Sequence, residues 1–148
     1  MKKALILLSL ALGGLACQTN EPLSPVSVTN STDTNKPIQQ FDPTGQTSVA
    51  EGNFMSNVHP TSGSVKLYQK AGKYTLVFEN FKTDSGPDLR IYLSEDKVAS
   101  KYVEISNKVN SGNYFIELPA NADPKTQKFV LIWCKQFSVL FGNAALSL

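Results

Sequence analysis

Short runs of apolar residues, each ended by turn residues, fill the chain from about residue 49 onward. Two of these runs, 63–69 and 73–79, alternate between apolar and polar residues and flank a Gly-containing loop, as in a β-hairpin. Residues 89–94 alternate in the same way. No segment carries apolar residues at helical spacing over three turns. The pattern therefore predicts an all-β fold.

Counting the weaker runs gives about eight strands, at the spacing expected of a sandwich or a small barrel. We favour an antiparallel β-sandwich made of two packed sheets. The run Phe129–Cys134 is apolar throughout, which predicts a central strand that is covered on both faces. The other predicted strands are 51–55, 101–105, 113–118, 138–141 and 144–148.

The first seventeen residues have the pattern of an export signal. Lys2 and Lys3 precede an uncharged apolar run over residues 4–12, which is too short to span a membrane as a helix. The arrangement resembles a bacterial lipoprotein signal peptide over residues 1–16. That resemblance implies a lipidated Cys17, carrying several acyl chains such as palmitate, as a stable membrane anchor. An ordinary secretory signal that contains a cysteine is the alternative.

A polar segment separates this signal from the strands. Residues 17–47 are rich in Thr, Asn, Ser, Pro and Gln, which predicts a flexible linker ahead of one folded domain over residues 48–148. We expect an exported protein that faces the periplasm or the cell exterior. Gln18 follows the cysteine, at the position where an inner-membrane retention signal would have Asp. In bacteria that use this signal, Gln18 would direct the protein to the outer membrane.

The charge balance gives no argument for a nucleic-acid partner. The chain has 14 basic and 12 acidic residues, and loss of Lys2 and Lys3 with the signal would make these numbers equal. Its only arginine is Arg90. A nucleic-acid surface needs clustered basic side chains.

The second cysteine, Cys134, would be the only free thiol if Cys17 is lipidated. A cysteine does redox or metal chemistry as a thiolate, in a cationic and accessible setting. Lys135 is adjacent, but neighbouring residues of a strand point to opposite faces. The alternative is a small buried residue at the end of a core strand.

Two polar loops hold the other candidate residues. His59, the only histidine, could bind a metal together with Cys134 and an acid, or could simply bond the loop backbone. Asp84 and Asp88 flank a Gly-Pro turn, where a carboxylate can bond nearby N–H groups, ligate calcium or face a site. With one histidine and no nucleophile or phosphate-loop motif, the chain gives little support for an enzyme.

Six separated motifs occur in a definite order: Gly52–Phe54, His59–Gly63, Leu76–Phe81, Gly86–Leu93, Ile132–Val139 and Phe141–Gly142. In content and order they resemble the DM13 domain family. The resemblance implies a β-sandwich with a proposed electron-transfer role, in which Cys134 is the redox candidate and His59 and Asp88 are candidate neighbours. It implies no particular cofactor.

Two functional hypotheses follow. The first is a membrane-tethered redox accessory domain that works with an unidentified partner protein, centred on Cys134. The second is a non-catalytic surface module that binds a protein or a glycan through loops or exposed tyrosines. The five tyrosines and Trp133 could form a surface that stacks on sugars or other rings, or could be ordinary sheet and core residues.

Overall fold

The computed structural model describes residues 40–147. The predicted signal peptide, Cys17 and most of the predicted linker lie outside this range. The described residues form eight strands and no helix, and therefore contain no helix that could cross a membrane. The strands are β1 (Thr47–Ser56), β2 (Thr61–Lys70), β3 (Lys73–Thr83), β4 (Leu89–Ser94), β5 (Tyr102–Ser106), β6 (Gly112–Glu117), β7 (Phe129–Cys134) and β8 (Val139–Ala145).

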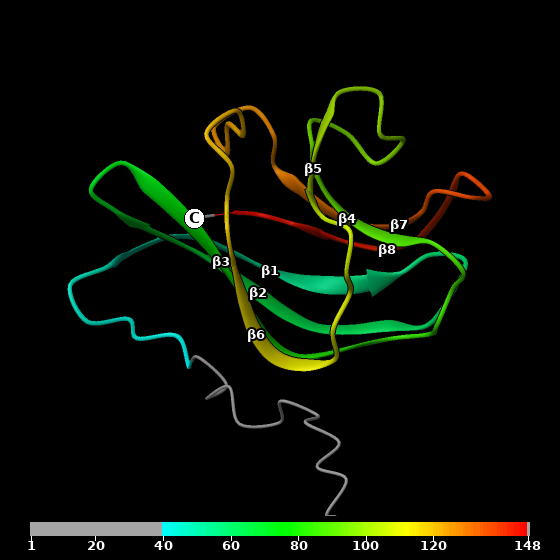
Figure 1. Ribbon diagram of the computed structural model, residues 1–148, viewed down its shortest axis with the longest axis horizontal. Helices are drawn as coiled ribbons and strands as arrows, with labels where there is room; N and C mark the ends of the chain where they lie inside the picture. Colours follow the sequence, from blue (N-terminus) through cyan, green and yellow to red (C-terminus); the bar gives the residue numbers. More distant parts are fainter. Residues whose placement is uncertain (1–39, 148) are drawn as a thin grey trace, which may run out of the picture. The chain divides into compact units, whose positions relative to one another are not determined.

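These strands form one antiparallel sheet in the order β5-β4-β7-β8-β1-β2-β3-β6, curled into a half-barrel (Figure 1). Strand β1 joins the two halves of the sheet. Its residues 47–53 pair with β2, whereas 54–56 pair with β8. A bulge between Ser48 and Ala50 interrupts the β1–β2 register, and bulges increase the local twist of a strand.

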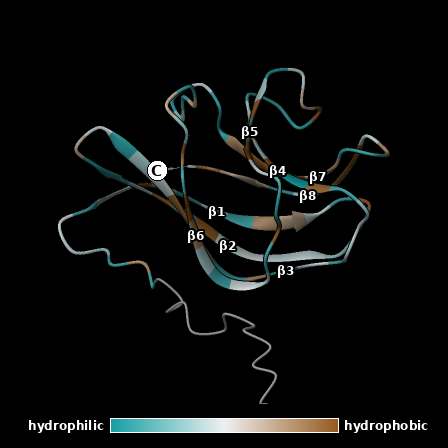
Figure 2. Ribbon diagram, viewed as in Figure 1, coloured by the Kyte–Doolittle hydropathy of each residue, from teal (hydrophilic) through white to brown (hydrophobic). Residues whose placement is uncertain are grey.

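The curl brings the inner faces of both halves together around one apolar core. Val65 and Leu76 of one half and Ile91 and Ile132 of the other are fully buried members of this core. In Figure 2 hydrophobic residues recur along the strands, whereas many loop residues are hydrophilic. Period-2 alternation places one side of each strand in the core, as expected of a sheet with one buried face.

Strand β7 is covered on both faces. Val130, Ile132 and Cys134 lie in the core, whereas Leu131 points to the outer face and is also fully buried. The outer cover includes Tyr92 of β4, which pairs with Leu131. The continuous apolar sequence of this strand follows from these two environments.

The predicted all-β class, the antiparallel pairing and the count of about eight strands are confirmed, and the two predicted segments 138–141 and 144–148 meet in one strand, β8. The detail that differs is the division into two sheets, because β1 pairs on both sides and makes the sheet continuous. Residues 40–46 also contact the sheet: the Phe41 ring lies 4.7 Å from that of Tyr68 and 5.8 Å from that of Phe115. Residues 40–46, which fall in the predicted linker, therefore pack against the sheet.

Candidate functional site

Cys134 is the last residue of β7, and it is completely buried. It pairs with Leu89 of β4 and Val139 of β8, and its side chain belongs to the apolar core. No hydrogen bond joins its sulfur to any of residues 40–147. The adjacent Lys135 directs its amino group to Glu104, at 4.0 Å. A thiol in apolar surroundings lacks the solvent access that thiolate chemistry needs.

His59 lies in the loop between β1 and β2, and its ring contacts a residue at the edge of the core. Its ring stacks on the ring of Phe141 with centroids 3.8 Å apart, and Phe141 belongs to the same core cluster as Cys134. Its Nδ1 atom lies 3.3 Å from a carboxylate oxygen of Asp84. The histidine therefore pairs with Asp84, at the start of the Gly-Pro turn, and not with Asp88.

Asp88 is held by a charged network on the other side of that turn. Arg90 donates from Nε to the Asp88 carboxylate and from a terminal nitrogen to Glu104, the latter at 2.9 Å. These carboxylates raise the pKa of the Arg90 guanidinium, the bond to Asp88 being the largest cause. The Asp88 carbonyl also accepts a bond from the Lys135 N–H at 2.9 Å, which ties the turn to the end of β7.

The turn itself packs closely on the core. A Cβ atom at Gly86 would lie 2.9 Å from a Leu89 methyl carbon and 3.0 Å from a Phe141 ring carbon. Only glycine permits this approach without displacement. A polar hollow of about 400 Å³ lies beside the turn, lined by residues 83–89 and by Asn107, Val109 and Ser111.

The structure thus brings the loop of His59, the Gly-Pro turn and the end of β7 close to one another. His59, Asp88 and Cys134 nevertheless do not form one cluster. His59 and Asp88 each have a different charged partner, and the sulfur is enclosed by apolar atoms. Within residues 40–147, no group of three or more His, Cys, Asp and Glu side chains is placed to hold a metal ion.

An aromatic stack on the outer face of the sheet was not anticipated as a unit. The Tyr92 ring lies 4.1 Å from Tyr102 and 6.3 Å from Trp133, at interplanar angles of 19° and 28°. Tyr92 is 1% exposed, whereas Tyr102 on the edge strand β5 is 44% exposed. The stack therefore extends from Trp133, which precedes Cys134 in the chain, to Tyr102 at the protein surface.

The burial of Tyr92 has an electrostatic consequence. Desolvation raises the pKa of the Tyr92 hydroxyl to about 12, with smaller contributions from Tyr102 and the Glu104 carboxylate. Tyr92 therefore stays neutral at physiological pH. The three rings lie on strands β4, β5 and β7, so their contact depends on strand order and register, which the sequence pattern does not reveal.

Comparison with known proteins gives one result. The family model for DM13, described as electron transfer DM13, matches residues 53–146. Neither the curated proteins nor the solved structures contain a significant match. The matched range covers β2 to β8 and the end of β1, including His59, Asp88 and Cys134. This chain belongs to the DM13 electron-transfer family.

Proposed function

We propose that this protein is an exported, lipid-anchored electron-transfer accessory domain, held to a membrane through Cys17 and acting on a partner protein. Membership of the DM13 family supports the electron-transfer role. The basic, apolar and small-residue pattern that ends at Cys17 supports export and lipidation. Bacterial outer-membrane or cell-surface placement is part of the same proposal.

The aromatic stack is the observation that carries the electron-transfer proposal. Electron tunnelling slows steeply with distance, so side chains with low oxidation potentials in close contact provide a faster route than saturated ones. Trp133, Tyr92 and Tyr102 form such a series, and its outer member reaches solvent. In this role a reduced donor protein loses one electron, an oxidised acceptor protein gains it, and the domain returns to its initial state.

Cys134 remains the redox candidate within this proposal. Its sulfur has no exposed surface, so exchange between the thiol and a partner protein must pass through neighbouring atoms. Trp133 precedes it in the chain and lies on the opposite face of β7, where the aromatic stack begins. His59 would act as a positioning residue through Phe141, and Asp88 through the bond that its carbonyl accepts from the Lys135 N–H.

The experiment is photochemical oxidation of the full chain by a soluble one-electron oxidant, with the resulting tyrosyl and tryptophanyl radicals followed by transient absorption. We expect the radical to settle on Tyr102, which is 44% exposed and can release its phenol proton to solvent as it loses the electron and regain it on reduction. Tyr92→Phe should slow its formation after oxidation of Trp133, because phenylalanine is much harder to oxidise. Tyr68→Phe, outside the stack, is the matched control. Equal kinetics in wild type, Tyr92→Phe and the control would refute the route.

The anchor has a separate test. Cells that express the full chain are fed a labelled fatty acid and then fractionated. We expect label and membrane association in the wild type and the loss of both in Cys17→Ser. A Cys134→Ser variant should keep the label. An unlabelled wild-type protein in the soluble fraction would show that the signal is an ordinary secretory one.

A further inference from the structure

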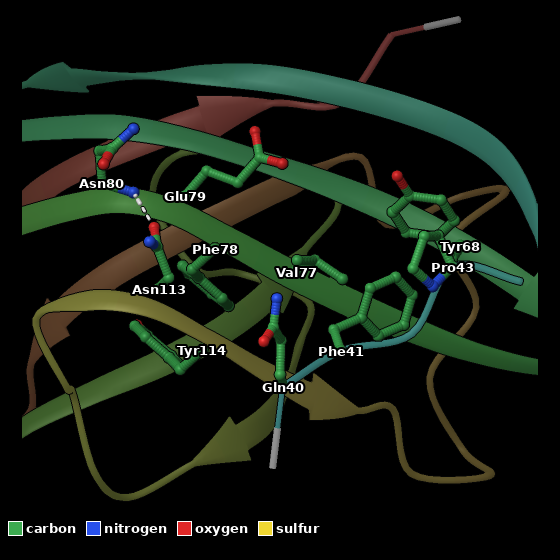
Figure 3. A pocket seen from close by; sticks show the side chains of 10 residues that line it. All are labelled: Gln40, Phe41, Pro43, Tyr68, Val77, Phe78, Glu79, Asn80, Asn113 and Tyr114. Atoms are coloured by element: carbon green, nitrogen blue, oxygen red, sulfur yellow. Dashed lines mark hydrogen bonds between the residues drawn. The ribbon is translucent and has the colours of Figure 1, made fainter. Parts of the chain in front are cut away.

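A hollow lies far from Cys134 in the sheet order, where residues 40–43 cross strands β2, β3 and β6 (Figure 3). Its volume is about 710 Å³, within the range of about 300–1,000 Å³ that is usual for small-molecule sites. Neither the charged network at Asp88 nor the aromatic stack reaches it. The electron-transfer proposal therefore leaves this hollow without a role.

Aromatic rings form one side of the hollow. Phe41 and Tyr68 lie together at that side, and Tyr114 lies across from them, as Figure 3 shows. Phe41 and Tyr68 are only partly buried, so part of their ring surface remains open to the hollow. The electron-rich face of such a ring attracts polarised C–H groups as well as apolar surface.

Carboxamide and carboxylate groups also line the hollow, together with Pro43, Val77 and Phe78. Asn80 and Asn113 lie beside a break in the β3–β6 pairing, where the side-chain oxygen Oδ1 of Asn113 accepts the Asn80 backbone N–H at 2.7 Å. The Asn113 amide is left with its two N–H donors. Gln40, in the segment that precedes β1, adds an exposed amide. These groups donate and accept hydrogen bonds without carrying charge.

The one carboxylate of the hollow is already neutralised. Glu79 accepts a bond from the Lys66 amino group at 3.0 Å and a weaker one from the Ser64 hydroxyl at 3.4 Å. A charged ligand would therefore find no free counter-ion among the residues that line the hollow. This balance favours a neutral, polar ligand.

Tyr114 is a lining residue of the hollow whose side chain packs against the core. The Tyr114 hydroxyl is the single buried side-chain polar atom of residues 40–147 that has no hydrogen-bond partner. Its ring stacks on Phe78, with centroids 4.5 Å apart, on the core face of the sheet. Hydrogen bonds to a ligand would therefore come from the amides and from Glu79.

From this combination we propose that the hollow is a binding site for a neutral saccharide. A sugar ring presents a C–H face that can pack on Phe41 and Tyr68, and hydroxyl groups around its edge that can bond the amides and Glu79. The site would let a tethered electron-transfer domain dock on a glycan. The proposal is independent of the electron-transfer route, because the two involve different residues on different strands.

The test is calorimetric titration of the full chain, held in a detergent without a sugar headgroup, with maltohexaose, cellohexaose and N-acetylchitohexaose. We expect at least one of these neutral probes to bind with a millimolar or tighter Kd. Tyr68→Ala and Phe41→Ala should each weaken that binding by about three- to tenfold. Phe137→Ala, which removes an exposed ring elsewhere, should leave it unchanged.

Gln40→Ala guards against loss of fold, because its side chain is exposed and makes no hydrogen bond within residues 40–147. It should weaken binding about threefold, the effect of one hydrogen bond. Three results would overturn the proposal: no binding of any neutral probe, binding that Tyr68→Ala and Gln40→Ala both leave intact, or a clear preference for galacturonate or glucosamine hexamers, which are charged.

Discussion

Replacement of Cys134 gives the most direct check on how this site is built. Its side chain is fully buried and its sulfur has no hydrogen-bond partner among the described residues. Cys134→Ala removes one heavy atom and leaves a small void, at a cost of about 1–2 kcal/mol of unfolding free energy. Cys134→Ser nearly preserves the shape but buries an unsatisfied hydroxyl, at a cost of about 1–3 kcal/mol in addition to the lost apolar transfer.

The order of stability is therefore wild type, then Ala, then Ser, although serine is the closer match in shape. Urea unfolding of the three full chains measures this order. Serine equal to or better than alanine would show that the hydroxyl finds a partner, and hence that the sulfur lies in a polar setting. That result would refute our interpretation of the burial.

Alkylation measures access to the same atom. If modification requires unfolding, a stability of about 5 kcal/mol slows it roughly 10³- to 10⁴-fold relative to the denatured chain. Peptide mass spectrometry assigns the modified position and separates Cys134 from Cys17. Native Cys134 that reacts as fast as the denatured chain would contradict the buried sulfur and would favour a directly reactive thiol.

Two further predictions concern packing and pH. Gly142→Ala should destabilise the fold by about 1–3 kcal/mol in urea unfolding, because the added Cβ would lie 2.4 Å from the Thr61 Cβ and hydroxyl oxygen, and an unchanged midpoint would contradict this close contact. The wild type should lose stability as the pH rises from about 10 to about 12, because the raised pKa of Tyr92 lets the unfolded state ionise first. Burial also raises the pKa of Tyr114, so Tyr92→Phe should reduce this loss without abolishing it, and unfolding curves at pH 8 and pH 11 measure the difference.

The strands could be read from the sequence because their signal is local. The predicted runs 89–94 and Phe129–Cys134 coincide with β4 and β7, and the prediction that β7 is central and covered on both faces is confirmed. Alternation with a period of two is a property of neighbouring residues, so no knowledge of strand order is needed.

Two features were harder to predict: that the strands form one continuous sheet, and that residues 40–43 pack on it. Whether β1 pairs on one edge or both depends on a bulge and on partners about ninety residues away, such as Ala144 for Phe54. The polar composition before residue 48 suggested a linker, yet one aromatic residue, Phe41, packs residues 40–43 onto the sheet. A single contact of this kind leaves no periodic signal.

The sequence by itself determined the all-β class, the strand positions and the family, because these depend on local patterns and on motif order. Only the tertiary structure decided which side chains meet. It paired His59 with Asp84, enclosed the Cys134 sulfur in the core, and aligned Trp133, Tyr92 and Tyr102 across three strands. The physical reason is that strand order and register join residues far apart in the chain, and no local pattern records those distances.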